Sequence, residues 1–140
     1  TPFSFCGECT IKIEHVALWS QDIEALEDLY ERHFGAKANV KYVNEKKKTQ
    51  AHFLTFASSA RLELMQSPGL KTVKDSASDD EFMGYAHLAM SVGSQEAVDK
   101  ITARLVEDAF ICSGGPRTRG DGYYESVVVD PKGNRIKITV

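Results

Sequence analysis

The sequence lacks any apolar run close to the ~20 residues that a membrane-spanning helix needs. It also shows no secretory signal pattern, so we expect a cytoplasmic protein with no membrane partner. The net charge of −3 provides no excess of positive charge for binding nucleic acid or an anionic surface. With 140 residues, of which 42% are hydrophobic, the chain is long enough for one ordinary folded domain with its own core.

Cysteine is also scarce, with three residues at positions 6, 9 and 112. An odd number without a secretory signal indicates a reduced, cytosolic setting. Cys6 and Cys9 form a C-x-x-C, but a redox motif would follow a strand, and a zinc site would need a second pair of ligands. We therefore expect residues 1–10 to be a poorly ordered N-terminal arm.

Two halves of the chain carry the same pattern, which predicts a duplicated βαβββ unit. His15 and His87 are 72 residues apart, and Glu63 and Lys137 are 74 apart, with the same order of predicted elements between them. The alternating segment 61–65 closely matches the terminal segment 135–140, but Glu63 and Lys137 stand at equivalent positions with opposite charge. The first module spans residues 11–66, the linker 67–82 and the second module 83–140.

Periodicity and turn residues predict the elements of each module. In the first module we expect a helix from about 21 to 34 and strands at residues 11–19, 40–43, 51–57 and 61–65. In the second we expect a helix from about 95 to 110 and strands at residues 85–90, 123–129 and 135–140. The Gly-rich segment 114–122 reads as a long connecting loop.

Five motifs together resemble the vicinal oxygen chelate superfamily of glyoxalase I, bleomycin-resistance proteins and extradiol dioxygenases. They are His15 in Ile-Glu-His-Val-Ala-Leu, Phe34-Gly35-Ala36, Arg61-Leu62-Glu63-Leu64, His87 in Tyr-Ala-His-Leu-Ala, and the segment Asp130 to Ile136. The resemblance covers about residues 11–140. It implies an α+β fold in which two tandem βαβββ modules form a single domain, a half-open mixed β-sheet barrel with the helices outside. It also implies a small-molecule cavity and a homodimer.

The resemblance further implies a divalent metal (Zn, Ni, Mn, Co or Fe) bound on the concave face. The family's ligand positions fall on His15, Glu63, His87 and Lys137, and the fourth position is usually a Glu. Alternation supports this placement, because Glu63 lies between Leu62 and Leu64 and Lys137 lies between Ile136 and Ile138, apolar neighbours that face the opposite way. Two imidazoles and one carboxylate suit such a cation and leave positions for water and substrate.

Lys137 conflicts with a metal. An ammonium about 4 Å from a dication is repelled by roughly 8 kcal/mol at an effective dielectric constant of ~20, whereas lowering a lysine pKa from ~10.4 to ~7 costs about 4.6 kcal/mol. Three arrangements of Lys137 would resolve this conflict. The lysine turns away and leaves three ligands, or it becomes neutral and acts as a base or ligand. In the third arrangement it pairs with Glu63 and replaces the metal.

The leading hypothesis is a lactoylglutathione lyase-like, metal-dependent lyase or isomerase acting on a small oxygenated substrate. Glu63 and Lys137 are then the candidates for proton transfer. The alternative is a metal-free, non-catalytic small-molecule binder of the antibiotic-sequestering type, which predicts an ion pair between Glu63 and Lys137. A ring-cleaving dioxygenase ranks lower, since its carboxylate ligand would fall at position 137.

The segment after the second helix supplies candidates for substrate binding. Arg117 or Arg119 is suited to hold an anionic group of the substrate. Tyr123, Tyr124 and Glu125 are candidates for lining the cavity, although only about half of an alternating strand faces inward.

Overall fold

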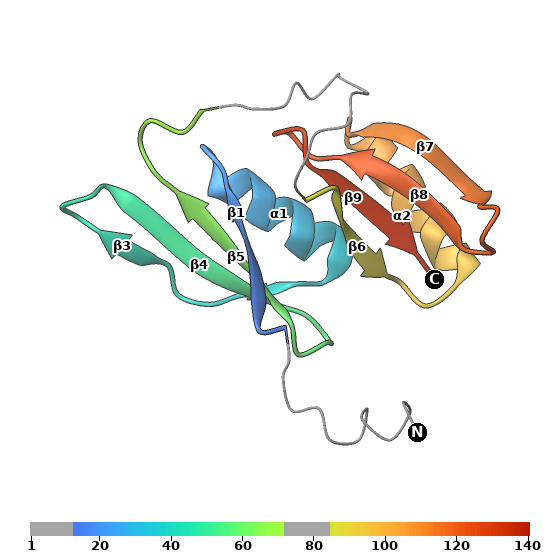
Figure 1. Ribbon diagram of the computed structural model, residues 1–140, viewed down its shortest axis with the longest axis horizontal. Coiled ribbons are helices and arrows are strands. Elements are labelled where there is room, and N and C mark those ends of the chain that lie inside the picture. The colour runs from blue at the N-terminus through green and yellow to red at the C-terminus, as the bar shows by residue number, and fades with distance from the viewer. Residues whose placement is uncertain (1–12, 72–84) are drawn as a thin grey trace, which may run out of the picture. The chain divides into compact units, whose positions relative to one another are not determined.

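The computed structural model describes residues 13–71 and 85–140 (Figure 1). The chain divides into two compact units, one ending at Leu70 and the other beginning at Lys71. No helix in the described part of the chain is long and apolar enough to cross a membrane. The predicted arm at residues 1–10 and most of the predicted linker at 67–82 lie outside the described residues.

The first unit is a mixed sheet with one helix. Its elements are β1 (His15–Trp19), α1 (Ile23–Phe34), β2 (Lys37–Ala38), β3 (Tyr42–Asn44), β4 (Thr49–Thr55) and β5 (Arg61–Gln66). The strand order is β1-β5-β4-β2, and β3 also pairs with β4. β1 runs parallel to β5, whereas the other pairs are antiparallel.

The sequence explains where α1 begins and ends. The Asp22 side chain accepts a hydrogen bond from the backbone N–H of Ala25 at 3.1 Å, which caps the first turn. Gly35 ends the helix with φ at 70°, a left-handed conformation that glycine adopts without steric cost. Between these ends an apolar stripe packs against the sheet, and the fully buried members of this core are Ile23, Leu26, Leu29, Tyr30, Leu54, Leu62 and Leu64.

The second unit repeats this plan. Its elements are β6 (His87–Ser91), α2 (Gln95–Glu107), β7 (Ile111–Thr118), β8 (Tyr124–Val129) and β9 (Arg135–Thr139), and the strand order is β6-β9-β8-β7. The Ser94 side chain caps α2 through the N–H of Ala97. The buried core consists of Val98, Leu105, Val128, Val129, Ile136 and Ile138.

The register of the parallel strands confirms the duplication. His15 lies opposite Arg61 in the β1–β5 pair, and His87 lies opposite Arg135 in the β6–β9 pair. Figure 1 shows each helix against one face of its own sheet. The predicted α+β class with two tandem βαβββ modules is therefore confirmed, and each sheet is open, with β1 and β6 as edge strands.

The structure departs from the predicted elements in two places. The segment 114–122 was expected to be a loop, but its first half continues as β7, through Gly114, Gly115 and Pro116. Such residues are tolerated there because β7 is an edge strand whose pairing with β8 is interrupted by two register shifts. The short strand β2 at Lys37–Ala38 was not expected at all, because two residues carry no readable periodicity.

Asp130 organises the turn between β8 and β9. The buried carboxylate of Asp130 accepts hydrogen bonds from the backbone N–H groups of Lys132 and Asn134 at 2.8 and 2.9 Å, and from Nδ2 of Asn134 at 3.0 Å. Burial nevertheless raises the pKa of Asp130. The turn fixes the register that places Val127 opposite Lys137.

Candidate functional site

His15 and Glu63 lie together on the sheet of the first unit. The β1–β5 register pairs Ala17 with Glu63, which places His15 and Glu63 diagonally across the two strands. Leu62 and Leu64, on either side of Glu63, are buried in the core, so Glu63 faces away from it. Nε2 of His15 lies 3.6 Å from Oε1 of Glu63, and the two side chains are 40% and 20% exposed.

Glu14 and Phe53 contact the His15 ring, and Arg61 contacts both of them. Nδ1 of His15 lies 3.1 Å from Oε1 of Glu14. The ring of Phe53 meets the imidazole edge to face, with centroids 5.3 Å apart, and the guanidinium carbon of Arg61 lies 3.8 Å above Phe53. Arg61 also donates a hydrogen bond to Glu14. This interaction, followed by the one with His15, lowers the pKa of Glu14.

In the second unit, Lys137 pairs with a carboxylate of its own sheet. Nζ of Lys137 lies 3.2 Å from Oε2 of Glu125, and both side chains are largely buried, at 16% and 8% exposed. Val127 lies opposite Lys137 in the β8–β9 pair, so Glu125, two residues earlier, shares its face. Glu125 was expected to line a cavity, which stays a prediction; the structure makes it the counter-ion of Lys137.

His87 belongs to the same face of this sheet. It lies opposite Arg135, while Lys137 lies opposite Ala89, two residues further along β6. Burial, followed by the positive charge of Lys137, lowers the pKa of the His87 imidazole, although Glu125 acts in the opposite direction. A neutral imidazole is the form that binds a metal.

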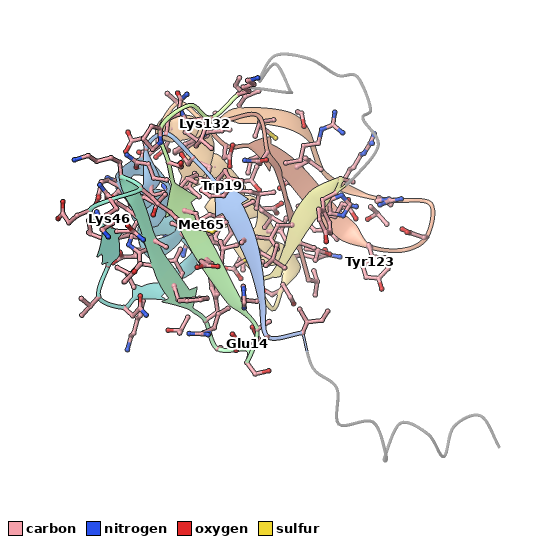
Figure 2. All side chains as sticks on the ribbon, turned by 60° about the vertical axis from the view of Figure 1, so that its left-hand side comes forward. Glu14, Trp19, Lys46, Met65, Tyr123 and Lys132 are labelled. Carbon is pink, nitrogen blue, oxygen red and sulfur yellow. The ribbon has the colours of Figure 1, made fainter. Side chains whose placement is uncertain are left out.

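The four residues predicted to bind substrate do not share one environment in the structure. Nη1 of Arg119 lies 3.5 Å from Oε1 of Glu125, so this arginine joins the Lys137 pair. Arg117 is exposed on β7, opposite Glu125 in register. Tyr123 is 56% exposed in the β7–β8 connection (Figure 2). Tyr124 donates a hydrogen bond to Asp99 of α2, which places it on the helix side of the sheet, away from Lys137.

The donors of the first unit fit a divalent cation. Two ligand atoms, each about 2.1 Å from one tetrahedral cation, are about 3.4 Å apart, close to the 3.6 Å between His15 and Glu63. Within the second unit, position 137 does not fit as a ligand, because its ammonium is already paired with Glu125. Among residues 13–71 and 85–140, no three His, Cys, Asp or Glu side chains are gathered closely enough to hold a metal.

Comparison with known proteins points to one family. The family model described as the Glyoxalase/Bleomycin resistance protein/Dioxygenase superfamily matches residues 12–138. No match was found among the curated proteins.

Several solved structures share the fold at low sequence identity. Glyoxalase I of Leishmania major, titled as trypanothione-dependent, has a TM-score of 0.72 at 21% identity, over 93% of this chain and 86% of that one. A glyoxalase family protein of Enterococcus faecalis has a TM-score of 0.74 at 21% identity, over 94% and 98% of the two chains. Glyoxalase I of Zea mays has a TM-score of 0.74 at 19% identity, but 91% of this chain covers only 44% of that one.

Proposed function

Because the chain belongs to the Glyoxalase/Bleomycin resistance protein/Dioxygenase superfamily, we propose that it is a metal-dependent lyase or isomerase acting on a small oxygenated substrate. The observation that carries this proposal is the 3.6 Å approach of the His15 imidazole to the Glu63 carboxylate on one exposed face. An imidazole and a carboxylate side by side are suitable ligands for Zn²⁺ and for the other first-row dications.

In this proposal His15 and Glu63 hold the metal, and His87 stays the predicted third ligand. The absence of a fourth protein ligand leaves positions for water and substrate. A bound dication would polarise a carbonyl oxygen of the substrate. The homodimer and the cytoplasmic location stay predictions.

The ion pair of Lys137 with Glu125 supports a metal over the metal-free alternative. That alternative uses Glu63 to neutralise Lys137, but Glu125 already does so at 3.2 Å within the same sheet. Glu63 is therefore not required as a counter-ion. Of the three arrangements of Lys137, we favour the one in which three ligands remain, because the pair with Glu125 keeps the lysine from serving as a metal ligand.

Glu63 and Lys137 are the groups we assign to proton transfer. Glu63 is the base that takes a proton from the carbon next to the substrate's carbonyl group, and Lys137 is the acid that stabilises the developing negative charge on oxygen. Arg119 lies within reach of the same Glu125 carboxylate and is suited to hold an anionic substituent of the substrate.

Deuterium exchange tests this function without knowledge of the natural substrate. The metal-loaded protein is incubated in D₂O with simple α-hydroxyketones, and loss of the carbon-bound proton signal is followed by NMR. We expect exchange above the buffer rate, and its loss in Glu63→Gln at saturating metal. Glu107→Gln is the matched control, because Glu107 ends α2 at the surface. Absence of exchange with every compound would contradict the proposal.

A further inference from the structure

The imidazole of His15 lies between two carboxylates, and they contact different nitrogens. Oε1 of Glu14 is 3.1 Å from Nδ1, within hydrogen-bonding distance, whereas Oε1 of Glu63 is 3.6 Å from Nε2, beyond it. Figure 2 shows Glu14 immediately before β1, at one end of the β1–β5 pair. Trp19 and Met65, which pair with each other, lie at the other end. The closer carboxylate is thus that of Glu14, which is not among the predicted metal ligands.

Glu14 is held in this place by more than its neighbour in sequence. Arg61 donates a side-chain hydrogen bond to its carboxylate, and the backbone N–H of Arg61 donates to the Glu14 carbonyl at 2.9 Å. The guanidinium of Arg61 is in turn stacked on Phe53, whose ring contacts His15. An isolated ion pair at the surface contributes little to stability. Here, however, Glu14, Arg61, Phe53 and His15 form a closed ring of contacts.

The hydrogen bond has a chemical consequence for the free nitrogen. A neutral imidazole carries one N–H, so a proton on Nδ1 leaves a lone pair on Nε2. With the proton on Nε2 instead, the ring would direct an N–H at Glu63 and would have no lone pair on that nitrogen to bind a cation. A carboxylate that binds the second nitrogen of a metal-ligating histidine fixes both its tautomer and its orientation.

We infer that Glu14 is a positioning residue that holds the proton of His15 on Nδ1 and directs the Nε2 lone pair toward Glu63, with Arg61 and Phe53 fixing the carboxylate. The effect of Glu14 on metal affinity rests on the proposed function. The effect on the tautomer does not, because it exists in the metal-free protein.

The tautomer is measured first, in metal-free protein labelled with ¹⁵N, at a pH about two units above the ordinary histidine pKa of ~6.5. Ring nitrogen shifts report which nitrogen of His15 carries the proton. We expect Nδ1–H in the unchanged protein, a shift toward Nε2–H in Glu14→Ala, and retention of Nδ1–H in Glu14→Gln, whose amide oxygen still accepts. The same tautomer in the unchanged protein and in Glu14→Ala would overturn the inference.

Metal affinity is measured next by titration with Zn²⁺. We expect Glu14→Ala to bind about 10- to 100-fold more weakly, and Glu14→Gln to recover most of that loss. Asp28→Ala is the matched control, since Asp28 has the same 61% exposure as Glu14 and pairs only with Arg32 in the contacts described for it. Equal affinity of Glu14→Ala and Asp28→Ala would contradict the inference. If the unchanged protein binds no metal while its tautomer depends on Glu14, the proposed function fails but the positioning role is supported.

Discussion

Nζ of Lys137 lies 3.2 Å from Oε2 of Glu125, and this pair changes how the fourth ligand position is understood. A lysine in place of a metal-binding carboxylate would otherwise present an uncompensated charge to any bound cation. Glu125, on the neighbouring strand, compensates that charge within the same sheet. The second unit therefore has an ion-paired lysine at the position where the resemblance predicts a carboxylate ligand.

Removal of the Glu125 charge should destabilise the protein. Lys137 is only 16% exposed, so Glu125→Gln leaves a largely buried ammonium without its counter-ion. We expect the free energy of unfolding to fall by about 3 kcal/mol at neutral pH, as measured by urea denaturation. The double variant Glu125→Gln with Lys137→Met should recover most of the loss. Additive losses in the double variant would show that the two side chains do not interact.

Lys137→Glu should restore the missing ligand and tighten metal binding by at least about tenfold, because it replaces a repulsive charge by a carboxylate. The matched control is Lys132→Glu, which makes the same charge change at an exposed position of the β8–β9 turn (Figure 2). Calorimetric titration with Zn²⁺ measures both. Equal affinities in the two variants would mean that Lys137 does not face the metal.

The fold could be predicted from the sequence because the signals are local and occur twice. Alternation around Glu63 and Lys137, the caps at Asp22 and Ser94, and the glycine after α1 each correspond to a structural feature. β7 was missed because Gly114, Gly115 and Pro116 are typical of loops, and only pairing with β8 makes them a strand. Such tertiary pairing is not visible in local propensity.

The candidate site was predictable only in part. Alternation placed His15 and Glu63 on one face, as observed. The Lys137–Glu125 pair could have been predicted from the sequence, since the turn at Asp130 fixes which β8 residue lies opposite Lys137. The contact of Glu14 with His15 could not have been predicted, because adjacent residues in extended chain ordinarily face opposite sides.

Gly115 should tolerate no side chain. Its φ is +76°, and a Cβ there would lie 2.5 Å from the backbone oxygen of Glu125. We expect Gly115→Ala to lower the free energy of unfolding by about 2 kcal/mol or more, from backbone strain and overlap. Gly114→Ala is the control, because a Cβ at Gly114 meets nothing within 4 Å. Equal stability of the two variants would refute this account of β7.

Acid should destabilise the first unit through His52. This side chain is 2% exposed, its Nε2 has no hydrogen-bond partner in the described structure, and burial and then Lys41 lower its pKa. The unfolded chain therefore binds the proton more tightly, so stability falls as pH drops below about 6.5, by at most about 1.4 kcal/mol per pH unit. Urea denaturation should show a weaker pH dependence in His52→Leu. An unchanged pH dependence in that variant would exclude His52 as the cause.

The metal content of the protein tests the central claim most directly. The protein is purified without a histidine tag and without chelators, incubated with Zn²⁺, Ni²⁺ or Mn²⁺, desalted and analysed by elemental mass spectrometry. We expect about one equivalent per chain, reduced strongly in His15→Ala, Glu63→Gln and His87→Ala. Less than about a tenth of an equivalent with all three metals would contradict the account.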